Sequence, residues 1–293
     1  MFFIRGFYIE TKEHSELKAQ SLPIQQKLLD RYLNILGISR REPNLDSLIE
    51  LVKVHMLRVP FENVSKLYYR KHLGLHNIPD LELFLDSIER YNFGGTCYSN
   101  NFYLYQLLAS LGYQVMLCGA DMSNLDAHMA SMVRVENKEY LVDVGYAAPF
   151  LMPLPRNLAT DYIIELGRDR YVLKPQDVLG CSRLELYRDG KLKHGYLAKP
   201  IPRQIRDFEK GIADSYCEDA TFMNALLLAR FFPNRSLVIH NLTVIESQGV
   251  VSSIRTLASQ DELVQAISEG FGIPSKFTID VVSDLRQLKD AWS

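Results

Sequence analysis

The spacing of apolar residues changes at Gly112, and this change constrains the fold more than any other feature of the sequence. Before Gly112, apolar residues recur three and four positions apart, which is the period of a helix. After it, the apolar stretches are short, rich in β-branched and aromatic residues, and separated by turn residues. Helices followed by strands, with a mixed region at the end, predict an α+β protein.

Helices are expected before Gly112 wherever an apolar stripe begins at a capping residue or ends at glycine. Asn44 and Asp80 are suitable N-caps, and Gly37 and Gly112 are suitable stops. Pro60 should interrupt the pattern and hold the preceding residue extended. The expected helices are 24–36, 45–57, 81–88 and 102–111, the last with a cysteine at or beside its first turn.

Strands are expected after Gly112, with tight turns at Asn137-Lys138 and Asp189-Gly190. Prolines make 147–170 resemble a long surface loop. The expected strands are 113–117, 129–135, 139–144, 172–173 and 184–187. Towards the end, the expected elements are a helical stretch at 220–232, a hairpin of 237–245 and 250–257 around Gln248-Gly249, a helix at 260–268 capped by Ser259, and a terminal helix at 283–292.

Composition indicates an ordinary globular protein with a large core: 293 residues, 47% apolar and 23% charged. A net charge of −2 gives no electrostatic reason to expect nucleic acid or a membrane surface as partner. No stretch of eighteen apolar residues predicts a transmembrane helix, and the apolar run at 1–4 is too short for a signal peptide. The four cysteines are far apart, without zinc spacing, so we expect free thiols, no metal and a reducing cytoplasm.

The stretch 92–101 carries the best candidate for a nucleophile. Two glycines lead into the expected helix, and Cys97 stands at or beside its first turn. Unpaired N–H groups and the positive end of the helix dipole favour a thiolate there, and glycines permit close approach to the sulfur. The alternative, a small buried hydrophobe, is the commoner role of such a cysteine. Only a base nearby would favour catalysis.

His128 and Asp143 are the candidates for base and orienting carboxylate. His128 precedes one strand, and Asp143 interrupts the apolar run of the next, where a lone carboxylate needs a partner. A solvated strand-end histidine and a cap or turn ion pair remain alternatives. With a turn at Asn137-Lys138, Asp143 faces Met132, and His128 is about 13 Å away along the sheet. Contact would then need another register, a bulge or a loop.

Four blocks of the sequence resemble the arylamine N-acetyltransferases. The blocks are Pro60-Phe61-Glu62-Asn63, Gly94-Gly95-Thr96-Cys97 with Asn101, His128 before a strand, and Asp143-Val144-Gly145-Tyr146. They occur in the family's order, and the His–Asp spacing is similar to the family's. A weaker similarity continues through Asn224, Pro233, Ser236 and Asn241-Leu242.

The resemblance implies a fold in three parts with a papain-like Cys-His-Asp arrangement. The parts are an N-terminal helical bundle at 1–112, a central antiparallel β-barrel at 113–218 and a C-terminal α/β lid at 219–293. In this scheme Cys97 is the nucleophile, His128 pairs with it and Asp143 holds the imidazole. Phe61 and Tyr146 correspond to residues that line the acceptor pocket, although both could be ordinary core aromatics.

The function implied by the resemblance is a ping-pong acetyl transfer through acetyl-Cys97. Acetyl-CoA is the co-substrate, and an arylamine, arylhydrazine or N-hydroxyarylamine is the acceptor, as in xenobiotic metabolism. Residues that contact coenzyme A and the oligomeric state are not assigned.

Two departures from the family pattern occur beside the cysteine. Phe93 stands where the family usually has arginine, and Ser99 stands where it usually has glutamate. Farther along the chain, Leu237 stands near the place where an aromatic pocket residue is common. These departures suggest one alternative, a weakly active small-molecule-binding relative. A Cys-His-Asp hydrolase or amide synthase of the same fold is a second alternative, which keeps the three residues.

Overall fold

The computed structural model describes residues 24–285 and 288–290. The early part of this region is helical, as expected, and its helices are α1 (Gln26–Leu36), α2 (Leu45–Arg58), α3 (Val64–Leu73), α4 (Leu81–Tyr91) and α5 (Cys97–Ser110). The apolar run at 1–4, considered as a signal peptide, lies outside the described residues.

Capping residues set the helix ends where the sequence predicts them. The Asn44 side chain accepts a hydrogen bond from the Ser47 N–H (2.8 Å), and Asp80 accepts one from the Leu83 N–H (2.8 Å). Helix α1 ends at Gly37, whose φ of 71° is left-handed. The predicted starts of α2 and α4 and the predicted end of α1 are therefore confirmed.

Helix α3 is not predicted by apolar spacing, because it buries polar as well as apolar side chains. Ser65 and Lys66 are buried beside Val64 and Leu67, so no continuous apolar stripe exists. The helix starts directly after the Pro60 break.

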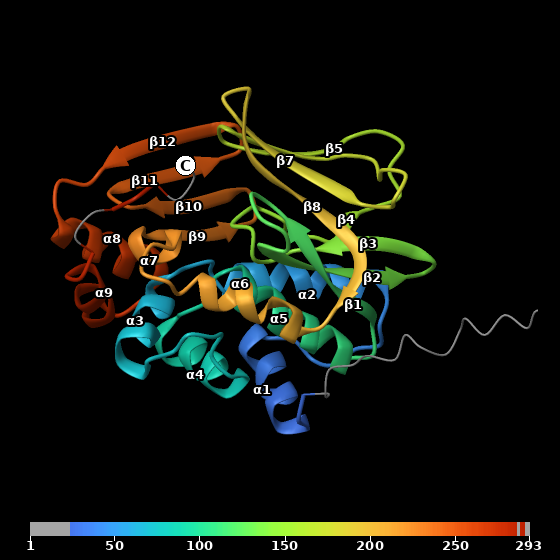
Figure 1. The fold of residues 1–293 in the computed structure, drawn as a ribbon, viewed down its shortest axis with the longest axis horizontal. Coiled ribbons are helices and arrows are strands. Elements are labelled where there is room, and N and C mark those ends of the chain that lie inside the picture. Colours follow the sequence, from blue (N-terminus) through green and yellow to red (C-terminus); the bar gives the residue numbers. More distant parts are fainter. Residues whose placement is uncertain (1–23, 286–287, 291–293) are drawn as a thin grey trace, which may run out of the picture.

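Eight antiparallel strands follow and curl into a nearly closed barrel (Figure 1). Their order in the sheet is β4-β3-β2-β1-β8-β7-β6-β5. The predicted α+β class and antiparallel barrel are thus confirmed. The strands are β1 (Gln114–Asp121), β2 (His128–Val135), β3 (Lys138–Val142), β4 (Leu154–Pro155), β5 (Tyr162–Leu166), β6 (Asp169–Leu173), β7 (Ser182–Arg188) and β8 (Lys191–Arg203).

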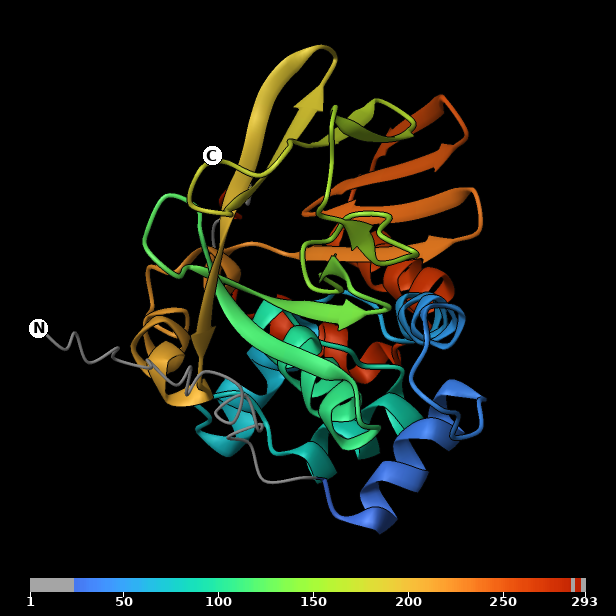
Figure 2. The same cartoon turned by 90° about the vertical axis from the view of Figure 1, so that its right-hand side faces the viewer.

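A second antiparallel sheet, in the order β12-β11-β10-β9, completes the described fold. Both views place the helices α1–α5 along one side of the molecule and the sheets on the other (Figures 1 and 2). The division at residues 112 and 218 stays a prediction. The remaining elements are the 3₁₀ helix η1 (Ile205–Phe208), α6 (Glu209–Asp214), α7 (Thr221–Asn224), β9 (Leu227–Phe232), β10 (Arg235–His240), β11 (Thr243–Gln248), β12 (Val251–Thr256), α8 (Gln260–Phe271) and α9 (Ser275–Val282).

Several sequence expectations in the second half of the chain are wrong. The stretch 147–170 is not one loop, because β5 and the start of β6 follow its prolines. The apolar run at 227–232 is the strand β9 rather than a helix; its residues are mostly buried, and such a run has no diagnostic period. The stretch 237–245 contains two strands, β10 and β11, separated by a turn at Asn241-Leu242.

The C-terminal expectations are met in part. Gln248 pairs with Val251, so the hairpin around Gln248-Gly249 is confirmed, and Ser259 caps α8 through the Glu262 N–H (3.2 Å). The terminal helix expected at 283–292 is wrong for 283–285 and for 288–290, none of which is helical. Residues 286–287 and 291–292 of that stretch lie outside the described residues.

The turn between β2 and β3 lies one residue earlier than expected. Glu136 and Asn137 both have positive φ, and Val135 pairs with Lys138. Moving the turn by one residue moves every cross-strand partner by two. Val142 therefore pairs with Ser131, and continuing the ladder brings Asp143 opposite Ala130, two residues nearer to His128 than the sequence predicts.

The stretch between α2 and α3 ties the helices to the second sheet. Phe61 exchanges two backbone hydrogen bonds with Ala229 of β9. The buried Asn63 side chain donates to the carbonyls of Phe222 (2.9 Å) and Ala225 (2.7 Å) and accepts from the Leu227 N–H (2.9 Å). These contacts join segments that are about 160 residues apart in sequence.

Among residues 24–285 and 288–290, no helix combines the length and apolar character needed to cross a bilayer. Nor does this part of the chain contain a group of three or more His, Cys, Asp or Glu side chains placed to hold a metal ion.

The variant Asn63→Ala should lower the free energy of unfolding by about 2 to 4 kcal/mol, because it leaves buried backbone groups without partners. Chemical denaturation followed by circular dichroism measures this. Asn77→Ala is the control, because the Asn77 side chain bonds only the neighbouring N–H at an exposed position, and its effect should stay within about 0.5 kcal/mol. Equal effects of the two variants would contradict the tethering role of Asn63.

Candidate active site

Cys97 is the first residue of α5 and lines a cavity of about 270 Å³. Thr96 is the N-cap, and no side chain caps the free N–H groups of this helix end. The thiol is partly exposed and is not bonded to another cysteine. The structure therefore places Cys97 at an accessible position where a helix favours negative charge.

The buried carboxyl group of Glu62 fixes the backbone segment that leads into Cys97. One Glu62 oxygen accepts from the Gly94 N–H (3.0 Å) and the other from the Ser65 N–H (2.9 Å). Gly94 itself could not carry a side chain, because a Cβ there would lie 1.9 Å from the Pro60 carbonyl oxygen. This glycine is needed for close backbone packing.

His128, the first residue of β2, forms a hydrogen bond with Asp143 just beyond β3. The distance from His128 Nε2 to Asp143 Oδ2 is 2.8 Å, and both residues are only 2% exposed. The 13 Å separation expected from the sequence is thus wrong, because the register differs by two residues. His128 lines the same cavity as Cys97, and Asp143 lies behind it.

Electrostatics favour an ion pair between His128 and Asp143. Burial lowers the pKa of His128, but the charge of Asp143 and interactions with Cys97 outweigh it, and the pKa rises to about 10. Burial raises the pKa of Asp143. The charge of His128 and the hydrogen bonds from His128, Asn101 and the Gly145 N–H lower this pKa by more than burial raises it, so the net shift is downward. Protonated His128 can therefore stabilise a thiolate on Cys97.

Asn101 connects the helix of Cys97 to Asp143. No role was expected for Asn101 beyond its place in the Gly-Gly-Thr-Cys block. Its Nδ2 donates to Asp143 Oδ1 (2.9 Å) and to the Met129 carbonyl (2.6 Å), while its Oδ1 accepts from the Val144 N–H (2.8 Å). The sequence does carry a signal for this role. Asn101 is four residues after Cys97, so the two side chains share one face of the helix, and an amide among mostly apolar helix residues needs hydrogen-bond partners.

Gly145 lets the loop after Asp143 lie directly on the start of α5. A Cβ at this position would lie 2.6 Å from Cys97 Cα and 2.7 Å from Asn101 Nδ2. The Gly145 N–H also donates to Asp143 Oδ1 (2.9 Å). A side chain here would separate the carboxylate from the helix.

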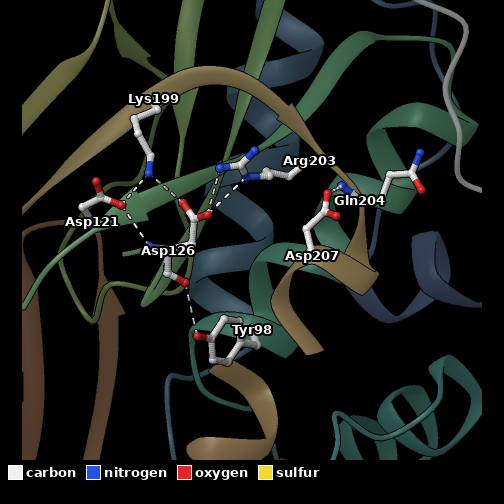
Figure 3. Close-up of polar contacts among 7 residues, drawn as sticks. All are labelled: Tyr98, Asp121, Asp126, Lys199, Arg203, Gln204 and Asp207. Atoms are coloured by element: carbon white, nitrogen blue, oxygen red, sulfur yellow. Dashed lines mark hydrogen bonds and ion pairs between the residues drawn. The ribbon is translucent and has the colours of Figure 1, made fainter. Parts of the chain in front are cut away.

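A cluster of four charges holds the segment that leads into His128 (Figure 3). Lys199 on β8 pairs with Asp121 (2.7 Å) and Asp126 (3.0 Å), and Arg203 pairs with Asp126 (3.0 Å). From below, the Tyr98 hydroxyl donates to the carbonyl of Asp126 (3.5 Å). The segment 122–127 is therefore fixed between the barrel and the residue that follows Cys97.

Phe61 and Tyr146, the predicted acceptor-pocket residues, both line the cavity that contains Cys97; their role in binding an acceptor stays a prediction. Phe61 packs edge-on against Phe222 (5.7 Å between ring centroids), and the Tyr146 hydroxyl lies 2.9 Å from His194 Nδ1. Aromatic walls of this kind suit a flat ring. Sequence reasoning missed several further lining residues, which come from strands distant in sequence: Asp169, Arg188, His194, Ser236 and Ser247.

Apolar packing occupies the place where the family motif has arginine. Phe93 is buried among aromatic rings, with centroid distances of 5.1 Å to Phe277, 5.6 Å to Tyr91 and 6.1 Å to Tyr69. Ser99 donates to the Thr96 carbonyl within the first turn of α5 (3.3 Å).

Known proteins similar to this chain include several arylamine N-acetyltransferases. Residues 44–279 match a family model described as N-acetyltransferase. An arylamine N-acetyltransferase of Gallus gallus, the pineal gland isozyme NAT-3, is 34% identical over 273 residues, which cover 81% of this chain and 90% of the relative. Arylamine N-acetyltransferase 1 of Homo sapiens is 25% identical over 210 residues, covering 62% of this chain and 69% of the relative.

Solved structures show the same fold. The arylamine N-acetyltransferase of Nocardia farcinica is 27% identical, with a TM-score of 0.72 over 88% of this chain and 95% of that chain. The Mycobacterium marinum arylamine N-acetyltransferase in complex with CoA has a TM-score of 0.73 over 88% of this chain and 99% of that chain. Its identity is 20%, so that likeness concerns the fold alone.

The stability supplied by the His128–Asp143 pair should depend on pH. The pKa of His128 rises from an ordinary 6.5 to about 10, so the stabilisation is complete below pH 6.5 and is lost as the pH rises towards 10. The difference in unfolding free energy between the unmodified protein and Asp143→Asn should shrink over this range. Urea titrations at a series of pH values measure it.

Asp207→Asn is the control for this titration. Asp207 is an exposed carboxylate that bonds the Gln204 N–H, so this variant should show a constant difference over the same range. A constant difference for Asp143→Asn as well would contradict the ion pair.

Proposed function

This chain belongs to the arylamine N-acetyltransferase family, a family of acyltransferases, and on that premise we propose that it transfers an acetyl group from acetyl-CoA to an aromatic amine. The acceptor is an arylamine, arylhydrazine or N-hydroxyarylamine, and the reaction runs as a ping-pong cycle through acetyl-Cys97. The observation that carries this proposal is the buried His128–Asp143 pair at the wall of a cavity that also contains Cys97.

In the first half-reaction, the Cys97 thiolate attacks the thioester carbonyl carbon, and the bond from that carbon to the coenzyme sulfur breaks. Nε2 of His128 is held by Asp143, so Nδ1 is the ring nitrogen left to give a proton to the departing thiolate. The products are acetyl-Cys97, neutral His128 and coenzyme A with a free thiol.

In the second half-reaction, the amine nitrogen attacks the carbonyl carbon of acetyl-Cys97. Neutral His128 takes the proton that the amine loses, and the carbon–sulfur bond to Cys97 breaks. The thiolate and the imidazolium are restored together. Asp143 keeps the ring in one orientation throughout, and Asn101 and the Gly145 N–H hold Asp143.

The walls of the cavity support an aromatic acceptor. Phe61 and Tyr146 present ring surfaces beside Cys97, and Phe222 supports the ring of Phe61. An acceptor ring lying against these walls would direct its amine towards the sulfur and exclude water from the acetyl-enzyme, which favours transfer over hydrolysis.

The setting of the reaction follows from the same proposal. The Mycobacterium marinum relative is solved in complex with CoA, which supports acetyl-CoA as the donor here. The compartment of this proposal is the cytoplasm, whose reducing conditions would keep the four free cysteines as thiols, and the proposed role is xenobiotic metabolism. The division into a helical bundle, a barrel and a lid at residues 112 and 218 belongs to this proposal too.

Incubation with acetyl-CoA in the absence of an acceptor should add one acetyl group to the protein, located on Cys97 by peptide mass spectrometry. Cys97→Ala should remove the label, because the nucleophile is lost. Cys217→Ala is the matched control, since it removes an exposed free thiol and should retain full labelling. Addition of an arylamine should then discharge the label as acetylated amine.

Labelling that persists in Cys97→Ala would refute the assignment of the nucleophile. Discharge to free acetate at the same rate with and without amine would instead indicate a hydrolase.

A further inference from the structure

A buried lysine lies beside the first turn of α5, outside the substrate cavity. Lys66, on α3, is 6% exposed. Its Nζ donates to Ser215 Oγ (2.7 Å) and lies 4.2 Å from the centroid of the Tyr216 ring. No carboxylate of the described residues forms an ion pair with it, and the cavity that it lines also contains Thr96 and Tyr98, the residues on either side of Cys97.

This arrangement is costly unless an anion lies nearby. An isolated ammonium loses much of its hydration on burial, and one hydroxyl and one ring face replace only part of it. Lys66 also shares a narrow cavity with Gly95, Thr96 and Ser99, at the positive end of the α5 dipole. A cation at that end is unfavourable unless negative charge is present there.

The charges of the groups around Cys97 indicate which anion the buried ammonium of Lys66 would neutralise. Asp143 and His128 cancel each other, so ionisation of Cys97 leaves the buried site with one net negative charge. The other titratable neighbours are tyrosines, whose pKa values burial raises: Tyr98 on α5, Tyr69 on α3 and Tyr216 after α6. Burial raises the pKa of the Glu62 carboxyl group, although the bonds from the Ser65 and Gly94 N–H groups oppose this, so a negative charge on Glu62 is disfavoured. Lys66 is therefore the charge that neutralises the thiolate form.

We propose that Lys66 is a positioning residue whose buried ammonium stabilises the Cys97 thiolate from outside the substrate cavity. The inference rests on the proposed role of Cys97 as a thiolate nucleophile. It accounts for a lysine in a place that otherwise offers it little stabilisation. It also gives this chain a cation close to the Gly-Gly-Thr-Cys segment, where Phe93 replaces the arginine of the family motif.

The stabilisation should operate over a defined pH range. Burial lowers the pKa of Lys66 and Cys97 partly opposes this, so that the pKa is about 8. Lys66 is charged below that value and loses its charge above it. Its effect on Cys97 should therefore be greatest below pH 8 and fade at higher pH.

The test uses Lys66→Met and Lys66→Arg in a Cys217→Ala background, which removes the exposed competing thiol. The rate of Cys97 alkylation by iodoacetamide is measured across pH 5 to 10, together with the melting temperature. Lys66→Met should slow alkylation about tenfold at pH 6 to 7 and converge on the parent above pH 9, whereas Lys66→Arg should restore most of the rate.

Lys210→Met, which removes an exposed lysine on α6, should leave the alkylation profile unchanged. A merely structural role predicts a lower melting temperature for Lys66→Met with an unchanged profile, and that result would overturn the proposal. Alkylation does not require acetyl-CoA, so the outcome is independent of whether Cys97 accepts acetyl.

A second measurement applies even if Lys66→Met fails to fold. The pKa of Lys66, followed by the ¹³Cε chemical shift, should be lower in Cys97→Ala than in the unmodified protein, because the opposing anion is gone. Identical values in the two proteins would refute the pairing.

Discussion

The candidate site depends on the buried carboxylate of Asp143, which has hydrogen-bond partners on both of its oxygens. One oxygen of Asp143 forms a hydrogen bond with His128 Nε2, and the other accepts from Asn101 Nδ2 and from the Gly145 N–H. Each donor comes from a different part of the chain: the start of β2, the interior of α5 and the loop after β3. An unpaired carboxylate in this place would destabilise the fold, so the same bonds hold the helix to the barrel and orient the imidazole.

The sequence predicts much of the local structure because caps and turns act over a few residues. Asn44, Asp80 and Ser259 all cap helices, as their positions suggest. The prediction fails where tertiary packing decides. The strand β9 has the same apolar pattern as a buried helix, and α3 carries polar residues that only the surrounding protein buries.

The candidate site shows the same limit. Cys97, His128 and Asp143 can be chosen from residue type and motif, yet the contact between His128 and Asp143 depends on a turn placed one residue earlier than expected. Asn101 has a sequence signal, whereas the pairing of Lys66 with Ser215 joins residues 149 positions apart and has none. Loss of the motif arginine likewise becomes interpretable only once Phe93 is found among aromatic rings.

The bonds of Phe61 and Asn63 to β9 and the segment before it have a consequence for biosynthesis. The carbonyls that Asn63 requires leave the ribosome about 160 residues after it does. The wall of the cavity that β9, β10 and β11 supply is therefore missing until these strands have been synthesised, and closure of so long a loop is slow compared with helix formation. A nascent chain thus contains Cys97 early but encloses it only after β9, β10 and β11 have been translated.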